Sequence, residues 1–275
     1  MAQWFLILSA LIYSLLFSYF SWGGAAAYVL AALPILLAYL VSRSWLAAAF
    51  MALLPMYFVI GQITAGWHHF TPYVALDHAM PLAPRWILVY ASLYLCAFVL
   101  PLVVVRSRQL FHQALKAYLF VMIVSYAGFV IYPTIAPRND ALPVHDFASW
   151  GLRLFYDLDQ PYGCFPSLHV AYSFVAALTC WRVHRGLGIA ACVWASLIGV
   201  STVYTKQHYV IDVPAGALAA VVAYLLFLRN LPGAGVADRD HQLAPRRARY
   251  VVAAYGAMIA VFTIAYTLGL GPVSR

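Results

Sequence analysis

Charged side chains are scarce in this sequence, and glutamate is absent. Charged residues make up only 9% of the 275-residue chain, whereas an ordinary soluble domain has roughly 25%. Apolar residues make up 65%, and the mean hydropathy is +0.85. This composition excludes a water-soluble globular domain, a disordered chain and a coiled coil. Since all eight acidic residues are Asp, any carboxylate chemistry must come from a short list of side chains.

Cysteine is also rare. The four cysteines are Cys96, Cys164, Cys180 and Cys192, and no two of them form a C-x-x-C pair. Three of them lie within apolar stretches, where cysteine usually behaves as a small apolar side chain. The sequence therefore predicts neither a disulfide framework nor a zinc knuckle, and we expect no metal and no other cofactor.

Long apolar runs take up most of the chain. A helix needs about 20 apolar residues to cross a hydrocarbon core of about 30 Å, and several runs approach that length without a charge. We therefore predict an all-α fold, a polytopic helical membrane bundle with about nine transmembrane spans. The first run follows Met1 closely, without a basic segment or a convincing cleavage site, so we expect it to be retained. The predicted spans are residues 4–20, 25–41, 45–65, 86–105, 115–132, 167–181, 187–204, 210–228 and 250–270.

The basic residues predict how the bundle is oriented. A net charge of +8 would suggest nucleic acid in a soluble chain, but here it is better explained by the positive-inside rule, so we expect no nucleic-acid partner. With the linker at Arg43 on the cytoplasmic side, the alternation of spans places eleven basic residues inside and five outside. We predict a protein of the cell (inner) membrane with its polar chemistry on the extracytoplasmic face. The outer basic residues are Arg85, Arg138, Arg153, Lys206 and Arg275.

Ionisable residues stand at the predicted outer ends of two spans. His208 and Asp212 are four residues apart, so on a helix they share a face and the carboxylate can orient the imidazole. His169 lies one turn into another apolar run, which opens with Pro166 and Ser167. Proline suits the first turn of a helix, serine can cap it, and the exposed amides at such an end bind anions. Because ionisable groups are costly in a membrane, these residues are candidates for a functional site.

Three classes of function are compatible with these residue types. One is a phosphohistidine enzyme that acts on lipid phosphates. Another is a metal-dependent membrane hydrolase in which His169, His208 and Asp212 bind the ion. A third is a transporter with a His/Asp proton relay, although the polar groups gather at one face and no charged residue lies in the middle of a span.

Two motifs resemble signatures of the type-2 phosphatidic acid phosphatase superfamily. The run STVYTKQHYVID, which begins at Ser201 and ends at Asp212, resembles the third signature S-R-x5-H-x3-D, with Thr202 in place of arginine. The run PSLH resembles the second signature P-S-G-H, with Leu168 in place of glycine. Both departures are closer to the inositol phosphorylceramide synthase branch. Only Arg138 is a candidate for the first signature, K-x6-R-P, and no lysine stands seven residues before it.

The resemblance implies a mechanism. The imidazole of His208, held by Asp212, would attack phosphorus and form a phosphohistidine, while His169 protonates the departing alkoxide. The family implies that no metal is required. The phosphate would be bound by a second group of residues, with Lys206 standing in for the missing arginine. That group is Arg138, Ser167, Lys206 and Ser201.

The resemblance also divides the chain and suggests substrates. We expect two accessory spans in residues 1–44, a six-span catalytic core in residues 45–230, and a basic linker with an accessory span in residues 231–275. The substrates would be lipids within the bilayer. Transfer to an acceptor alcohol is favoured, with simple dephosphorylation of phosphatidate, phosphatidylglycerophosphate or polyprenyl phosphate as the alternative. The long outer loop 133–166 would then form a lid, in which Asp157 and Asp159 bind hydroxyl groups of the acceptor.

Overall fold

A computed structural model describes residues 35–40, 42–138, 142–231 and 238–271 of the chain. Within these ranges the fold is all α-helical, and the only β-pairing consists of two isolated bridges, Phe70 with Thr134 and Ile135 with Tyr162. The predicted span 4–20 lies outside the described residues, as does most of the predicted span 25–41.

Seven apolar helical segments coincide with the remaining seven predicted spans. Five are long and apolar enough to cross a membrane, and two are shorter. The predicted helical membrane bundle is therefore confirmed for the described part of the chain, whereas its division into accessory and catalytic parts stays a prediction. The five long segments are Trp45–Thr64, Pro84–Val104, Arg108–Ile131, Arg185–Tyr204 and Gln242–Thr267, and the two short ones are Leu168–Val183 and Asp212–Leu228.

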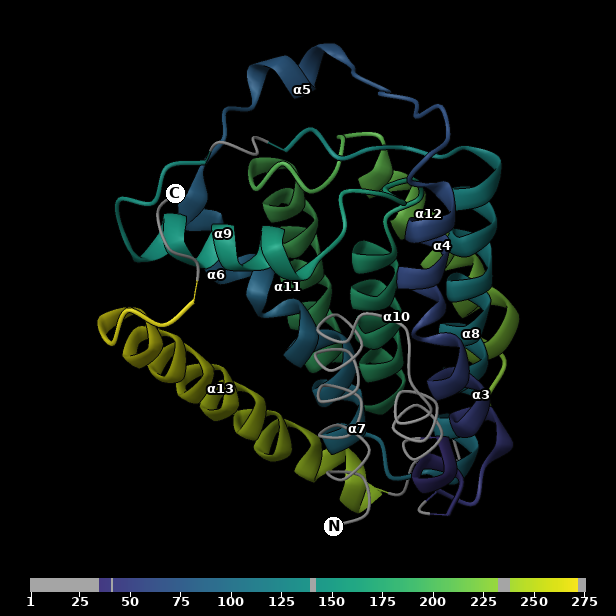
Figure 1. The fold of residues 1–275 in the computed structure, drawn as a ribbon. Coiled ribbons are helices and arrows are strands. Elements are labelled where there is room, and N and C mark those ends of the chain that lie inside the picture. The colour runs from purple at the N-terminus through teal and green to yellow at the C-terminus, as the bar shows by residue number, and fades with distance from the viewer. Residues whose placement is uncertain (1–34, 41, 139–141, 232–237, 272–275) are drawn as a thin grey trace.

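Each segment is built from one or more helical elements (Figure 1). Pro55 interrupts the first segment, and the second passes through a 3-10 turn and a π-helical turn. The elements are α3 (Trp45–Leu53), α4 (Met56–Thr64), η1 (Pro84–Trp86), α6 (Ile87–Ala91), η2 (Leu95–Val99), α7 (Leu100–Val104), α8 (Arg108–Ile131), α10 (Leu168–Val183), α11 (Arg185–Tyr204), α12 (Asp212–Ala223), η3 (Tyr224–Leu228) and α13 (Asp238–Thr267).

Polar side chains begin three of these helices. Ser107 caps α8, Ser167 caps α10 and His184 caps α11, each accepting a hydrogen bond from a backbone N–H three residues on. Such a bond satisfies a donor that the helix itself leaves open and contributes about 1 kcal/mol. The chain therefore turns between α10 and α11 at a single residue, His184.

Helix α10 lies at the centre of the bundle and packs against α8, α11 and α12. It contributes small and aromatic side chains to the core. Tyr172 lies among the rings of Phe50, Phe98 and Tyr118. Because successive segments run in opposite directions, the connections 65–83, 132–167 and 205–211 all lie at one end of the bundle (Figure 1).

The connection 132–167 contains a helix that the sequence analysis did not predict. Helix α9 (Phe147–Leu158) follows a capping box in which Asp146 and Ser149 bond reciprocally, and the bonds from Ser149 lower the pKa of Asp146. Leu152 and Phe155 turn inward and pack with Ile87 of α6 in a second apolar cluster. The segment is thus partly a folded helix, and the short helix α5 (Ala75–Ala79) lies in the other long outer connection.

Helix α13 runs obliquely along the outside of the bundle (Figure 1). Only 6% of its most apolar 18-residue window is buried. Two hydrogen bonds attach it and the residues just after it, from the Tyr255 hydroxyl to the Leu88 carbonyl at 2.7 Å and from Trp150 Nε1 to the Leu270 carbonyl at 3.1 Å. The last predicted span therefore contacts α6, α7 and α9, and most of its most apolar window is exposed in the described part of the chain.

Candidate active site

The centre of the site is the pair His208 and Asp212. His208 lies in the turn after α11 and Asp212 begins α12, and their side chains are 3% and 0% exposed. His208 Nδ1 lies 3.1 Å from Asp212 Oδ2, which also accepts a hydrogen bond from the Tyr209 backbone N–H at 2.9 Å. Because a carboxylate only accepts, the proton belongs on Nδ1 and the lone pair of Nε2 is available.

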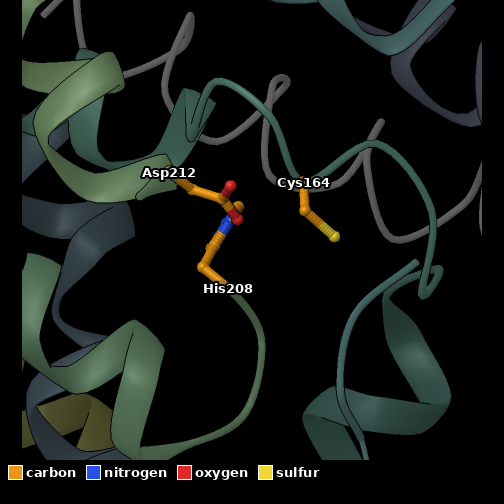
Figure 2. A group of neighbouring side chains, drawn as sticks. All are labelled: Cys164, His208 and Asp212. Carbon is orange, nitrogen blue, oxygen red and sulfur yellow. The ribbon is translucent and has the colours of Figure 1, made fainter. Parts of the chain in front are cut away.

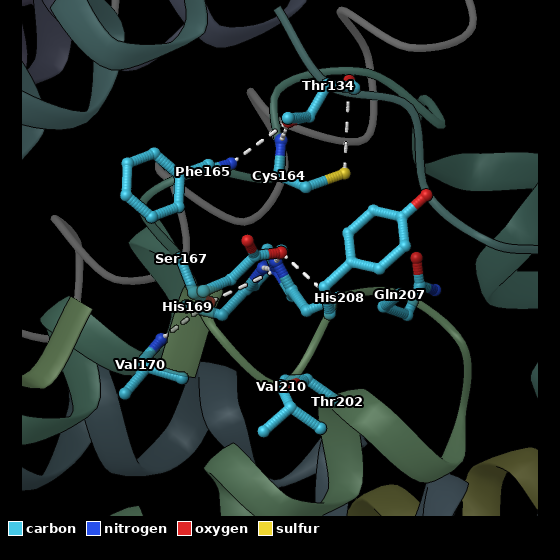
Figure 3. A network of polar contacts seen from close by, with 12 residues as sticks. Thr134, Cys164, Phe165, Ser167, His169, Val170, Thr202, Gln207, His208 and Val210 are labelled. Atoms are coloured by element: carbon cyan, nitrogen blue, oxygen red, sulfur yellow. Dashed lines mark hydrogen bonds and ion pairs between the residues drawn. The ribbon is translucent and has the colours of Figure 1, made fainter. Parts of the chain in front are cut away.

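Two residues from the start of α10 face that lone pair. His208 Nε2 lies 3.1 Å from the hydroxyl of Ser167 and 3.0 Å from Nδ1 of His169 (Figure 3). The Ser167 backbone N–H donates to the Asp212 carbonyl at 3.2 Å, which joins the N-terminal ends of α10 and α12. The structure therefore brings His169, His208, Asp212 and Ser167 together, as the spacing of the motifs predicts.

A glycine permits this close approach of α10 and α12. A Cβ atom on Gly216 would lie 2.3 Å from the Ser167 carbonyl oxygen. Any other residue at this position would push the two helix ends apart. The distances from His208 Nε2 to Ser167 and His169 thus depend on Gly216, which lies one turn after Asp212 and has no side chain that could react.

Tyr90 and Asp159 lie on the side of the His169 ring that faces away from His208. The sequence analysis did not place either of them beside the histidines. His169 Nε2 lies 3.3 Å from the Tyr90 hydroxyl and 4.0 Å from Asp159 Oδ2. Asp159 accepts a hydrogen bond from the Tyr57 hydroxyl at 2.8 Å, and its side chain is 10% exposed. Asp157 instead forms an exposed ion pair with Arg153 at 3.0 Å.

The two aspartates that the sequence analysis paired therefore have different environments. Asp157 lies on the outer surface of α9, whereas Asp159 follows the last turn of the helix and points inward. The amphipathic pattern of residues 147–158 is typical of a surface helix. This pattern could have indicated that the two aspartates would have different environments.

Arg138 lies beside Asp159 at the edge of the site. Its guanidinium donates to the carbonyl oxygens of Asp159 at 2.6 Å and Gln160 at 3.1 Å, and lies 3.6 Å from the Asp159 carboxylate. It also donates to the side-chain oxygen of Gln207, the residue before His208. The buried Arg138 Nε and Gln207 Nε2 atoms have no hydrogen-bond partner in the described ranges. These two N–H donor groups are thus available to bind a ligand. The sequence analysis did not identify Gln207 as a site residue because its side chain is uncharged.

The structure places two other predicted phosphate-binding residues elsewhere. Lys206 has a positive φ of 55° and donates from Nζ to the carbonyl oxygens of Met80 at 2.6 Å and Asp77 at 3.4 Å. Ser201 donates to the Ile198 carbonyl within α11 at 2.6 Å. These bonds direct Lys206 to the connection 65–83 and Ser201 into its own helix, so neither is brought to the Nε2 atom of His208.

The metal-ligand set considered from the sequence is not assembled around one point. His169 approaches Nε2 of His208 and Asp212 approaches Nδ1, so the two lie on opposite edges of the ring. Among the described residues, the donor atoms that do converge are those of Cys164, His208 and Asp212, all within 4.8 Å of one another (Figure 2). Burial raises the pKa of the Cys164 thiol, so it carries its proton when no cation is bound.

Comparison with known proteins agrees with the signature residues. A family model described as the PAP2 superfamily matches residues 72–226, which include both histidines and Asp212. A PA-phosphatase related-family protein of Dictyostelium discoideum is 29% identical over 109 residues, which cover 36% of this chain and 20% of that protein. The match thus spans about a fifth of the length of that relative. No solved structure matches the chain.

Proposed function

The chain belongs to the PAP2 superfamily, which supports a function of the lipid phosphatase or phosphotransferase type. On this premise we propose that it is an integral-membrane enzyme that moves phosphoryl groups of lipid substrates through a phosphohistidine on His208. The observation that carries the proposal is the two-sided contact of the His208 ring. Asp212 holds Nδ1, while Nε2 faces Ser167 and His169 at about hydrogen-bond distance.

The first step is attack of His208 Nε2 on the phosphorus of the lipid phosphate. A P–N bond forms, the P–O bond to the lipid breaks, and its electron pair leaves with the lipid oxygen. His169, in its protonated form, gives that oxygen a proton, so a neutral alcohol departs. Asp212 stabilises the positive charge that develops on the His208 ring.

In the second step a water molecule or an acceptor alcohol discharges the phosphohistidine. Neutral His169 removes the proton of the attacking O–H group, a new P–O bond forms, and the P–N electron pair returns to His208. Proton and charge are thereby restored for the next cycle, and the protein's own residues suffice for both steps.

Substrate binding requires His169 to move. Its Nδ1 atom lies 3.0 Å from His208 Nε2, and a phosphoryl group cannot fit between two nitrogen atoms at that separation. Asp159 Oδ2, 4.0 Å from His169 Nε2, lies on the side to which the ring can withdraw. A protonated His169 would form a closer ion pair there.

Several donors can stabilise the charge on the phosphoryl oxygens. The first amides of α10 point out of a helix N-terminus, which favours anions. The Ser167 hydroxyl lies next to the attacking nitrogen, and Arg138 Nε and Gln207 Nε2 are open donors at the edge of the site. Lys206 is not needed in this arrangement, because its ammonium group is already bound to backbone carbonyls.

We favour transfer over hydrolysis as the second step. Helix α9 packs Phe155 against Tyr90, the partner of His169, and this covers one side of the site against water. Hydrolysis is the second candidate, favoured by the name of the Dictyostelium relative. The match identifies the superfamily, so the likeness to the inositol phosphorylceramide synthase branch stays a prediction.

The test uses purified full-length protein in vesicles that contain lipids with a labelled phosphate. Phosphatidate and a phosphatidylinositol are offered with and without ceramide, diacylglycerol or inositol, and inorganic phosphate and new labelled lipids are quantified. We expect a labelled transfer product that appears only with one acceptor, and its loss in His208→Ala. Release of inorganic phosphate alone, whatever the acceptor, would establish hydrolysis instead, and wild-type turnover by His208→Ala would contradict the mechanism.

A further inference from the structure

Cys164 lies beside the catalytic pair, and the proposed mechanism gives it no role. It is in the connection between α9 and α10 and is 2% exposed. Its backbone N–H donates to the Thr134 hydroxyl at 2.9 Å, which fixes its position. Its sulfur makes only weak contacts, 3.8 Å from the Pro161 carbonyl and 4.0 Å from the Thr134 carbonyl.

The side chains of His208 and Asp212 lie near this sulfur. Their donor atoms and the Cys164 sulfur all lie within 4.8 Å of one another (Figure 2). Asp212 is fully buried, and its Oδ1 atom has no hydrogen-bond partner in the described part of the chain. A buried carboxylate oxygen without a partner is costly, and a cation bound by both oxygens of Asp212 would reduce that cost.

The spacing suits a small ion. His208 Nδ1 and Asp212 Oδ2 are 3.1 Å apart, and two ligand atoms at about 2.1 Å from a tetrahedral ion are separated by roughly 3.4 Å. An ion can therefore enter between them after a shift of a few tenths of an ångström. Sulfur takes a third position at about 2.3 Å from the ion after it moves toward the pair, since the three donor atoms lie within 4.8 Å of one another and bound ligand atoms of this kind are separated by roughly 3.6 Å.

The donor set determines which ion fits. One sulfur, one nitrogen and one oxygen match Zn²⁺ and similar thiophilic cations, whereas Mg²⁺ and Ca²⁺ prefer oxygen alone. A thiolate, a carboxylate and a neutral imidazole also balance two positive charges, so the buried site would be neutral. We propose that Cys164, His208 and Asp212 form an inhibitory binding site for a thiophilic divalent cation such as Zn²⁺.

A bound cation would stop turnover because it blocks the attack of His208 on phosphorus, the first step of the proposed function. The cation takes the lone pair of His208 Nδ1, so the imidazole proton moves to Nε2 and the thiol proton passes to water. Because Nε2 then has no free lone pair, and because the cation withdraws electron density from the ring, His208 can no longer attack phosphorus. Inhibition therefore rests on the proposed function, but occupancy of the site does not.

Occupancy is tested first, without any lipid substrate. Co²⁺ is added to the purified full-length protein in detergent, and the sulfur-to-cobalt charge-transfer band is recorded. We expect one Co²⁺ per chain, a band that Zn²⁺ abolishes, and no band in Cys164→Ser. Cys180→Ser is the matched control, because Cys180 is also buried but lies near the other end of α10, and it should keep the band.

Inhibition is then measured as a Zn²⁺ titration, with each variant compared with its own zinc-free rate. Cys164→Ser should raise the half-inhibitory Zn²⁺ concentration by a factor on the order of ten or more, and Cys180→Ser should leave it within about twofold. Equal inhibition of both variants and the wild type, or a cobalt band that survives Cys164→Ser, would overturn the proposal. A normal band in a protein that turns over no lipid phosphate would instead refute the proposed function alone.

Discussion

Two imidazole rings stand in series between two carboxylates at the centre of the candidate site. Asp212 lies 3.1 Å from one end of the series, and Asp159 lies 4.0 Å from the other. The shorter contact fixes His208, whereas Asp159 also serves Arg138 and Tyr57 and leaves room for His169 to move. At the scale of residues, this difference supports the proposed roles of His208 as the nucleophile and His169 as the mobile acid.

Replacing each of the two histidines by alanine should therefore affect turnover and the phosphoenzyme differently. His208→Ala should abolish turnover and any acid-labile phosphoenzyme, because Asp212 holds the far side of the His208 ring at 3.1 Å, whereas Asp159 lies 4.0 Å from His169. His169→Ala should still accumulate phosphoenzyme from a substrate with a good leaving group, such as p-nitrophenyl phosphate, because departure then needs no proton. Rapid acid-free quenching with labelled substrate measures the intermediate, and an intermediate that survives His208→Ala would contradict the assignment.

The carboxylate of Asp212 is expected to matter through orientation. Asp212→Asn keeps the size of the side chain but offers a donor where His208 needs an acceptor. The turnover number should fall by about two to four orders of magnitude, while the circular dichroism spectrum and the thermal midpoint change little. A loss of less than threefold would make Asp212 a helix-end residue without a catalytic role.

Asp159 should support His169 specifically as an acid. Asp159→Asn removes the negative charge near His169 Nε2, so proton donation weakens. Turnover of a natural lipid phosphate, whose alkoxide leaves poorly, should fall on the order of tenfold or more, whereas p-nitrophenyl phosphate should be affected far less. Asp157→Asn removes the same charge from the exposed face of α9 and is the control. An equal loss with both substrates would indicate that Asp159 is purely structural.

At the scale of elements, apolar runs predict where the helices lie but not how their ends meet. The lengths of the runs placed both ends of α11 to within two residues, because burial in a membrane requires that length, whereas α8 begins seven residues before the predicted span. Helix α9 escaped detection because its polar outer face reads as a loop, although Asp146 and Ser149 form a capping box. The contacts of Asp159 and of Lys206 were not predictable, since Tyr57 and Met80 lie on other elements far away in the sequence.

The contact between the ends of α10 and α12 should be intolerant of a single methyl group. Gly216→Ala would place a Cβ atom 2.3 Å from the Ser167 carbonyl, so the two ends must separate at a cost of about 1–3 kcal/mol. Turnover should fall strongly because Ser167 and His169 move away from His208. Gly256→Ala on α13, where nothing lies within 4 Å, should keep full activity. Thermal unfolding and turnover of the two variants, measured side by side, check this, and equal activities would contradict it.

At the scale of the whole molecule, the basic residues near the site are occupied by local contacts. Arg138 and Lys206 bind backbone carbonyls and Arg153 pairs with Asp157. The connections at the other end hold several more basic side chains. The positive-inside rule depends on this unequal number of Lys and Arg residues at the two ends of the bundle. Those residues are Arg106, Arg108, Arg182, Arg185 and Arg229.

This asymmetry predicts that the site faces away from the cytoplasm. His145→Cys and Gln109→Cys place a thiol at two exposed positions, the first in the connection 132–167 just before α9 and the second in the first turn of α8, where the connection at the opposite end of the bundle enters it. A membrane-impermeant maleimide applied to intact cells should label His145→Cys and spare Gln109→Cys until the membrane is permeabilised. The native cysteines, which are buried or half-buried, provide the background in the unsubstituted protein. The reverse labelling pattern would place the phosphate chemistry in the cytoplasmic leaflet and would reverse the direction from which lipid substrates reach His208.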